Sequence, residues 1–524
     1  MKKYQQIIIT LLFILITYYF ILPPLNLSSP LFWNYLILIG IFYFAMSLTN
    51  YKFNLFKIDG VNVRIKDKKG KFIFGFIALI FLLIFIINIV NLPLFNSKSY
   101  YERITVSDSD FTNDVKEVDF DELALLDKDS STKLGDRVMG QMTDLVSQFY
   151  VSNLYTQISY KDTILRVTPL EYNGFIKYLT NSKDGIKGYI TVNSVTGESD
   201  LKRLDQGMKY VDSAYFFQDL NRKLRLSYPT AIFGEKNFEL DDEGNPYWIV
   251  ETISYTGVGL KKKVNGVIIL NPITGESTKY EINDVPTWVD HVYASDLVIE
   301  QLNDWGNYKN GFFNSIFGQK DVVKTTTGYN YLVMDGDVYL YTGITSVSSD
   351  ESNIGFVLVN LRTKETKFYN VAGAEEYSAM SSAVGQVQQM SYTSTFPLLI
   401  NLKGKPTYLV SLKDNAGLVK MYAFVDYTDY QKVVVTNSSE GILKAAQNYL
   451  GGSISNGNEL TKNIEITSIK SAVVDGITYY YIKDDKVVYK ASIKVSEKLL
   501  PFLTSGDDIN ITYDGDNNEI ISIN

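Results

Sequence analysis

Three long apolar runs occupy the first hundred residues and constrain the chain more than any other feature. They cover residues 7–22, 31–48 and 72–94. As a helix the third run is about 34 Å long, which is enough to cross the core of a bilayer. Lys2 and Lys3 before the first run also fit a signal peptide, but Pro23 and Pro24 are followed by no small-residue cleavage site. We therefore predict a membrane anchor of three transmembrane helices over residues 1–95; a cleaved signal peptide and a re-entrant segment are the alternatives.

The two loops between these runs differ in charge. Residues 51–71 contain seven basic and two acidic residues, whereas residues 23–30 contain no charged residue. The positive-inside rule therefore places the N-terminus and the 51–71 loop in the cytoplasm. Three crossings then put everything after about residue 96 outside the cell membrane. A dedicated site for anionic lipids in the basic loop is the weaker interpretation.

The remaining chain is acidic. Residues 96–524 carry 41 Lys and Arg against 56 Asp and Glu, so a nucleic-acid partner is not expected. The whole chain has no cysteine and one histidine, His291, which excludes disulfides, thiolate metal sites and sites that need two imidazoles. We accordingly predict no metal and no cofactor. The lack of cysteine, with abundant Lys, Asn, Tyr and Ile, is typical of exported proteins of low-GC Gram-positive bacteria.

The segment after the anchor is rich in Asp, Glu and Ser. Residues 96–132 predict a solvated acidic stalk or a short irregular lead-in. A calcium site is not favoured, because no loop with a central glycine and a closing glutamate is present.

A repeated turn motif organises residues 133–437. Asn193, Asn271 and Asn360 each follow an apolar run and begin the stretches N-S-V-T-G-E, N-P-I-T-G-E and N-L-R-T-K-E. The Thr-Gly pair supplies the positive φ that a hairpin turn needs, although Lys364 replaces the glycine in the third copy. The spacing of about 80 residues is the length of a small domain, not of a propeller blade.

Helical periodicity precedes each group of strands. We predict one helix through Leu134–Phe149, a second through Met208–Leu224, a third through Val289–Leu302 and a fourth through Tyr377–Val387. The unit is then a helix followed by a three-stranded antiparallel sheet, giving four α+β modules at 133–203, 204–284, 285–372 and 373–437. Residues 438–524 predict a short helix and a small C-terminal β-barrel of OB-like or SH3-like type.

This helix-plus-hairpin unit with its N-x-x-T-G-E turn resembles the PepSY family of bacterial exported modules. The resemblance covers residues 133–437. It implies an extracytoplasmic, non-catalytic module linked to the regulation of peptidases or of other envelope proteins.

Catalytic motifs are lacking in the sequence. His291 is predicted on a helix, where the adjacent Asp290 cannot orient it, so a structural role is favoured over a catalytic one. No G-x-S-x-G elbow and no phosphate-binding loop is present. A pair of carboxylates suited to glycoside hydrolysis stays open, since sequence alone does not reveal which acids face each other. No catalytic residue is assigned.

A second repeated stretch supplies the candidate interaction residues. The stretch I-F-G-E-K at 232–236 recurs as I-F-G-Q-K at 316–320. A copied turn whose Ile and Phe fill the core is one interpretation, and a recognition surface is the other. The candidate residues are Ile232, Phe233, Lys236, Ile316, Phe317 and Lys320.

These features together predict a function in binding rather than in catalysis. The hypothesis is a membrane-anchored extracytoplasmic interaction or regulatory protein of the bacterial cell envelope, with an envelope protein, such as a peptidase, as partner and the lipid bilayer as anchor. One alternative is a surface enzyme that acts on a cell-wall polymer with a carboxylate pair. A further alternative is a structural subunit of a membrane complex.

Overall fold

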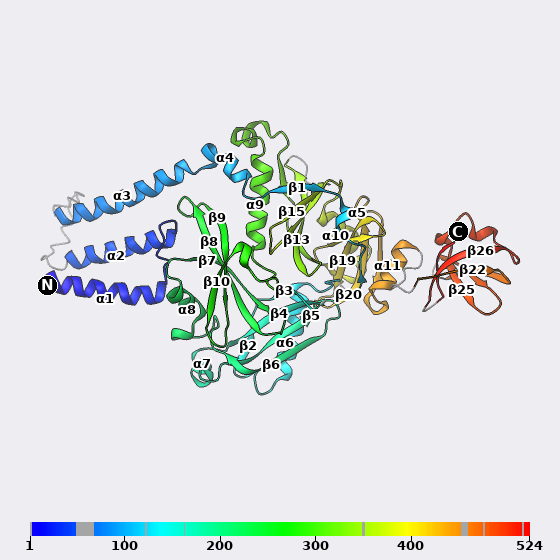
Figure 1. Cartoon of the computed structure of the whole chain (residues 1–524), viewed down its shortest axis with the longest axis horizontal. Coiled ribbons are helices and arrows are strands. Elements are labelled where there is room, and N and C mark those ends of the chain that lie inside the picture. The colour runs from blue at the N-terminus through cyan, green and yellow to red at the C-terminus, as the bar shows by residue number, and fades with distance from the viewer. Residues whose placement is uncertain are drawn as a thin grey trace. The chain divides into compact units, whose positions relative to one another are not determined.

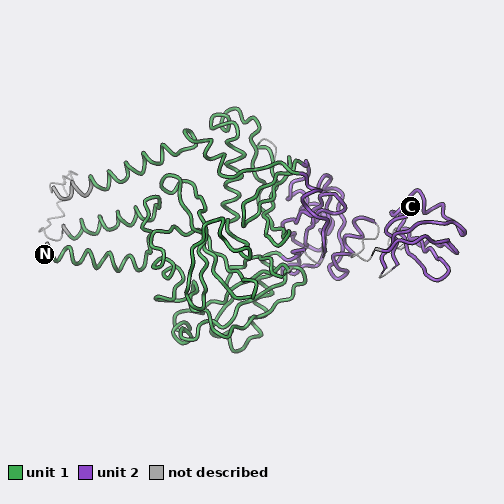
Figure 2. Tube along the Cα trace, in the orientation of Figure 1, with its two compact units in different colours: residues 1–109, 127–350, 354–370 green, residues 110–126, 351–353, 371–524 purple. Residues whose placement is uncertain are grey.

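The structure, a computed structural model, describes residues 3–48, 68–120, 123–161, 163–347, 352–451, 459–474, 477–515 and 518–523. The described chain forms two compact units, which Figure 2 distinguishes by colour. Unit 1 comprises residues 1–109, 127–350 and 354–370, and unit 2 comprises residues 110–126, 351–353 and 371–524. Most of the predicted basic loop, from 51 to 67, lies outside the described residues.

The N-terminal part of unit 1 consists of apolar helices (Figure 1). They are α1 (Lys3–Ile21), α2 (Pro30–Leu48), α3 (Lys68–Val90) and α4 (Pro93–Tyr101). Among the described residues, α1 alone is long and apolar enough over Tyr4–Ile21 to cross a membrane by itself. The apolar part of α2, Pro30–Met46, is shorter, and α3 qualifies only together with α4, to which it is bent by 56°. One apolar N-terminal helix suited to an anchor or a signal sequence is therefore present, and two further spans stay a prediction.

Two antiparallel sheets follow in unit 1. The first has the order β2-β4-β5-β6 with β3 also on β4, and the second has the order β10-β9-β8-β7. Their strands are β2 (Phe149–Val151), β3 (Thr156–Tyr160), β4 (Thr163–Tyr172), β5 (Ile186–Asn193), β6 (Ser199–Met208), β7 (Ile232–Leu240), β8 (Pro246–Thr256), β9 (Lys261–Leu270) and β10 (Ser277–Glu281). The accompanying helices are α6 (Lys128–Gln141), α7 (Phe175–Asn181), η2 (Phe216–Gln218), α8 (Leu220–Ser227) and η3 (Ile282–Asp284).

A third sheet has the order β1-β15-β14-β13-β11, with β12 on β13 and β16 on β14. Its strands are β1 (Val106–Ser109), β11 (Val323–Thr325), β12 (Asn330–Met334), β13 (Asp337–Ser346), β14 (Ser352–Asn360), β15 (Thr366–Tyr369) and β16 (Gly373–Ala374). The helix α9 (Ser295–Tyr308) and the short π-helix η4 (Asn314–Gly318) precede β11. One apolar core joins residues of the second sheet, α9 and the third sheet, including Ile249, Val298 and Leu340.

Unit 2 holds a fourth sheet and the C-terminal domain. The fourth sheet has the order β17-β19-β20-β21 with β18 on β19. Its elements are α5 (Phe111–Asp114), α10 (Glu376–Gly385), η5 (Gln388–Met390), β17 (Thr393–Ser394), β18 (Leu398–Leu402), β19 (Lys405–Lys413), β20 (Val419–Asp426), β21 (Val433–Asn437), η6 (Ser438–Glu440) and α11 (Ile442–Leu450). The prediction of a mostly β body built from several small sheets is thus confirmed.

The C-terminal domain consists of two three-stranded sheets, β22-β26-β27 and β23-β24-β25. Residues of both sheets share one core that includes Ile464, Ile482 and Ile511. The elements are β22 (Glu459–Glu465), β23 (Ser468–Val474), β24 (Ile477–Lys483), β25 (Val488–Ser492), η7 (Ile493–Val495), η8 (Leu500–Phe502), β26 (Asp508–Asp514) and β27 (Ile520–Ile523). The described residues form paired sheets here, and the predicted closed barrel is not seen among them.

The repeated motif forms the same turn three times. In each copy the asparagine Oδ1 accepts hydrogen bonds from the second and third following amides, at 2.9–3.1 Å. The residue four places after the asparagine donates its amide to the asparagine carbonyl in all three copies. That residue is left-handed at Gly197, Gly275 and also Lys364, where φ is +66°. The substitution of lysine for glycine in the third copy therefore leaves the turn unchanged.

Three predicted helices are wrong in their bounds. The first, α6, ends at Gln141, and Phe149 instead pairs with Tyr172 as the first residue of β2. Met208 ends β6, so only α8 remains of the second, and α9 begins at Ser295 instead of near residue 289. In each case part of the helically spaced apolar series belongs to a strand or to irregular backbone instead of a helix.

Of the two interpretations of residues 96–132, a solvated stalk or a short irregular lead-in, the solvated stalk does not agree with the structure. Residues 106–109 form β1, which pairs in parallel with β15 inside unit 1. Within unit 2, Phe111, Val115 and Phe120 are buried, and the amide of Val118 donates to the carbonyl of Asn401. The apolar residues spaced between the acids therefore fix this segment to the folded units.

Candidate functional site

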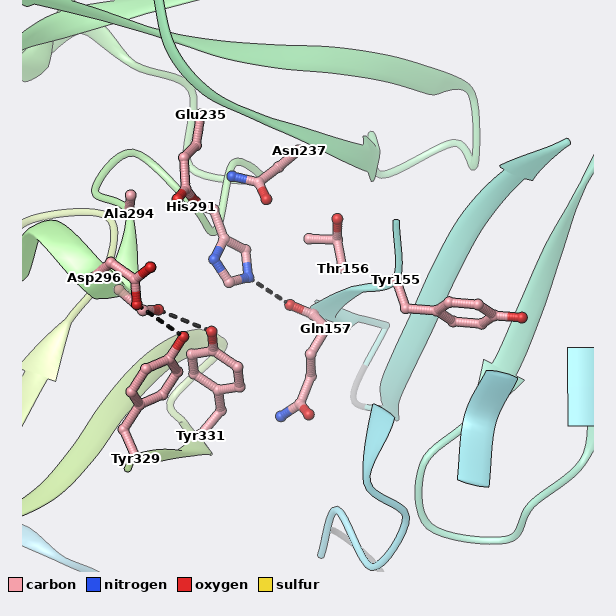
Figure 3. Close-up of a pocket in the computed structure, with 11 residues that line it drawn as sticks. Tyr155, Thr156, Gln157, Glu235, Asn237, His291, Ala294, Asp296, Tyr329 and Tyr331 are labelled. Atoms are coloured by element: carbon pink, nitrogen blue, oxygen red, sulfur yellow. Dashed lines mark hydrogen bonds between the residues drawn. The ribbon is translucent and has the colours of Figure 1, made fainter. Parts of the chain in front are cut away.

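A small polar pocket of about 80 Å³ lies in unit 1 where residues of the first three sheets meet (Figure 3). Its residues come from β3, β7, the start of α9 and β12. Figure 3 shows the imidazole of His291 at the centre, with Glu235 and Asn237 above it and Tyr329 and Tyr331 below. The lining residues are Tyr155, Thr156, Gln157, Glu235, Asn237, His291, Ala294, Ser295, Asp296, Tyr329 and Tyr331.

Two buried glutamates position the segment that leads into α9. Glu239 of β7 accepts the backbone amides of Asp290, at 2.8 Å, and His291, at 3.1 Å. Glu251 of β8 accepts the amides of Ala294, at 2.5 Å, and Glu235, at 3.1 Å. These carboxyl groups thus satisfy amides that irregular backbone would otherwise leave buried without an acceptor.

Burial changes the protonation of these groups. It raises the pKa of Glu239 to about 8 and that of Glu251 to about 7, although the amide donors oppose the shift. Burial, followed by the nearby Glu239, also raises the pKa of Asp290, whose Oδ2 accepts the amide of Ser159 at 2.7 Å. The perturbed carboxyl groups at 239, 251 and 290 are therefore engaged in holding the backbone.

His291 is buried and hydrogen bonded. Its Nε2 lies 2.7 Å from the carbonyl oxygen of Gln157, and its ring meets Tyr331 edge to face at 5.9 Å. Burial, and then the nearby Arg166, lowers the pKa of His291 to about 4, so the imidazole is neutral at pH 7. These contacts are typical of a histidine with a structural role. His291 precedes α9 and does not lie on the predicted helix.

Two carboxyl groups, those of Glu235 and Asp296, line the pocket. Partial burial, and then repulsion from Asp296, raises the pKa of Glu235. The Tyr329 hydroxyl donates to Asp296 at 3.5 Å. The hydroxyl groups of Ser295 and Tyr331 share a hydrogen bond of 2.8 Å. The pocket can hold a small polar molecule, and the pKa of one of its carboxyl groups, that of Glu235, is raised.

A metal site is not apparent in this part of the chain. No group of three or more His, Asp or Glu side chains suited to a metal ion occurs among the described residues.

The first set of predicted interaction residues lies on β7 in unit 1, with Ile232 buried and Phe233 and Lys236 partly buried. Ile232 is buried in β7, and the Phe233 ring lies 4.3 Å from the guanidinium of Arg225. Lys236 forms an ion pair with Asp212 and donates to Asn221 at 3.2 Å. Each of the three residues thus has contacts within the described part of unit 1, and their role in binding stays a prediction.

The second set lies on η4 and is exposed. Ile316 is 51% exposed and Phe317 is 80% exposed, and Phe313 at the start of the same turn is also exposed. Asn314 ties the turn to Lys320, accepting its amide at 3.2 Å and donating to its carbonyl at 2.9 Å. The two echoes in the sequence thus form a strand in one case and a π-helical turn in the other, and they are not brought together.

Sequence reasoning missed the junction between the apolar helices and the sheets. Arg225 of α8 is buried and donates from Nε to the carbonyl of Leu22, at 3.0 Å, and from Nη1 to that of Ala231, at 2.5 Å. A second junction joins Asn88 of α3 to Val258, whose amide and carbonyl both bond the Asn88 side chain. Because Arg225 and Leu22 are 203 residues apart in the chain, and Asn88 and Val258 are 170 apart, no local pattern could have revealed these two contacts.

Comparison with known proteins does not assign the chain to a family. No protein-family model matches the chain, and no curated protein matches it either.

Proposed function

We propose that the chain is a membrane-anchored extracytoplasmic binding protein of the bacterial cell envelope. The proposed anchor uses three spans, α1, α2 and α3, with the N-terminus in the cytoplasm. The apolar composition of all three helices supports the spans, and the charge difference between the loops at 23–30 and 51–71 supports the orientation. The body then acts beside the outer surface of the membrane.

The PepSY-like organisation is part of the proposal. It is supported by the three turns of identical hydrogen bonding and by helices that pack on sheets. Gly135 of α6, for example, lies against Tyr155 and Ile190 of the first sheet. A module of this kind implies a protein partner, and a peptidase of the envelope is the class that the resemblance suggests.

One observation carries the binding function, namely the exposed surface of η4. Phe313, Ile316 and Phe317 present three large apolar side chains from a turn that Asn314 holds in place. Apolar side chains gathered on a fixed turn mark interaction sites, and π-helical turns are frequent at such sites. Lys320 adds a positive charge beside this surface. We therefore propose that η4 holds an envelope protein.

Photo-crosslinking in cells tests this assignment. A photoreactive amino acid at Phe317 is expected to give a discrete adduct with one protein of the envelope. The same amino acid at Val146, an exposed apolar residue of the same unit, is expected to give none. The Phe317→Ala, Ile316→Ala double variant should lose the adduct formed from Phe313 while keeping the unfolding midpoint, since both side chains lie in solvent. Adducts with lipid alone, or equal protein adducts at both positions, would contradict the proposal.

A second candidate function rests on the pocket. Glu235 and Asp296 both line it, and the raised pKa of Glu235 suits a general acid for hydrolysis of a glycan. Turnover of wall glycan by the purified protein, abolished by Glu235→Gln without loss of folding, would favour this enzyme over the binding protein.

A further inference from the structure

Large apolar side chains on α7 and η2 are exposed to solvent in the described part of unit 1. We call this surface the aromatic patch and define it as Phe175, Ile176, Leu179, Tyr215, Phe216 and Phe217. Ile176 and Phe217 are 66% and 67% exposed. The rings of Phe175 and Tyr215 contact each other at 5.0 Å, so α7 and η2 form one surface although they are about 40 residues apart. A contiguous apolar surface of this kind marks an interaction site.

Backbone geometry holds the patch outward. Phe216 has a φ of +54°, a left-handed conformation that is unfavourable for a bulky residue. The guanidinium of Arg222 donates to the carbonyl of Phe216 and stabilises this turn.

The patch adjoins the end of α1. The ring of Phe217 lies 6.0 Å from the ring of Tyr19, in the last turn of α1. Arg222, which stabilises the patch, also donates from Nε to the carbonyl of Tyr19 at 3.3 Å and stacks over its ring at 4.0 Å. In Figure 1, α7 and α8 lie on the side of the sheets from which the apolar helices extend.

These contacts fix the depth of the patch relative to α1. Tyr18, Tyr19 and Phe20 end the helix, and aromatic residues at the end of a span mark the boundary between hydrocarbon and head groups. A side chain in ring contact with Tyr19 lies at that same boundary. We propose that the aromatic patch rests in the lipid interface of the membrane that holds α1, burying its side chains about 5–10 Å into the head-group region.

A bilayer suits this surface better than a protein partner does. The patch mixes Phe and Tyr with Ile and Leu, which is the composition of interfacial anchors. Lys177 of α7 and Lys183 just after it can extend their amines to lipid phosphates while their stems stay on apolar surface. The inference uses the membrane anchoring proposed above and is independent of partner binding through η4.

Depth-dependent quenching tests the inference on the full chain in lipid vesicles. Because the chain has no cysteine, Ile176→Cys carries the only thiol for an environment-sensitive fluorophore. Glu243→Cys, in the exposed turn before β8, is the control. Glu243 precedes β8, and Val258, which bonds Asn88 of α3, follows it. Because an extended strand rises about 3.3 Å per residue, the 11 residues of β8 place Glu243 about 35 Å from the contact between Val258 and α3.

The fluorophore at residue 176 is expected to show a blue-shifted emission and strong quenching by lipids with a spin label near the head group. Aqueous iodide should quench it only weakly. The control at 243 should show the reverse order. Strong iodide quenching at 176 without lipid quenching would overturn the inference, and protection from both quenchers would also overturn it by indicating protein as the occupant. Carbonate extraction of both variants reports separately on the anchoring, so failure of the anchor is distinguishable from failure of the patch.

Discussion

Between about pH 5 and pH 8, unit 1 is expected to lose roughly 2.5 kcal/mol of unfolding free energy through Glu251 alone. Burial raises the pKa of this carboxyl group from 4.5 to about 7, while nearby Lys262 opposes the shift and Glu235 adds to it. A group whose pKa is raised by folding contributes its full stabilisation at pH values below the pKa that it has in the unfolded chain. That stabilisation is lost as the pH rises through the folded pKa.

The measurement is denaturant unfolding of the purified full chain in detergent, followed by tryptophan fluorescence. All four tryptophans, Trp33, Trp248, Trp288 and Trp305, belong to unit 1, so the signal reports on that unit. The matched control is Glu251→Gln, which cannot titrate at this position. It keeps the opposing contribution of His291, whose lowered pKa costs stability as the pH falls from about 6.5 towards 4. Parallel pH profiles for the two proteins would show that Glu251 does not titrate as described.

Replacing Arg225 with alanine is expected to destabilise unit 1 by about 3 kcal/mol or more. Its guanidinium donates to the carbonyls of Leu22, at 3.0 Å, and of Ala231, at 2.5 Å, and it covers the ring of Phe233. Burial lowers the pKa of Arg225 to about 10, so the group stays charged at neutral pH and its bonds are charge assisted. Removing it leaves the partly buried carbonyls of Leu22 and Ala231 without this donor and removes one of the contacts at the end of α1.

The same unfolding measurement checks this expectation, together with hydrogen exchange over residues 228–233. Arg225→Lys should recover part of the lost stability, since one amine cannot reproduce the forked set of donors. Arg203→Ala is the control, because Arg203 pairs with Asp144 at the surface and both side chains are more than half exposed. An Arg225→Ala protein as stable as the Arg203→Ala protein would show that this junction is not held by the guanidinium.

The sequence and the structure agree best where the signal is local. The N-x-x-T-G-E turn needs only six neighbouring residues, so its hairpin could be predicted from Asn193 and Asn271 alone. The third copy shows the limit of such reasoning. A lysine at position 364 does not by itself predict a positive φ, and contacts with distant parts of the chain stabilise this conformation. The amine of Lys364 donates to the carbonyl of Arg103 at 2.6 Å, and burial lowers its pKa to about 8.

Helix bounds and the pocket depend on contacts between distant parts of the chain. The four-residue spacing from Leu134 continues through Phe149, yet the pairing of Phe149 with Tyr172 ends the helix early. The pocket is lined by residues between 155 and 331, and no short stretch of sequence contains residues from two of its sides. The echo at 232 and 316 likewise has two structures, since β7 is paired along its length and η4 is not part of a sheet.

The central claim, that the body acts outside the membrane that holds its N-terminal helices, is tested most directly by single-cysteine labelling of intact cells. The cysteine-free chain makes each introduced thiol unique. Glu243→Cys, in the body, is expected to react with a membrane-impermeant maleimide, and Lys57→Cys, in the basic loop, is expected to react only after the cells are permeabilised. Labelling of Lys57→Cys and protection of Glu243→Cys in intact cells would contradict the account.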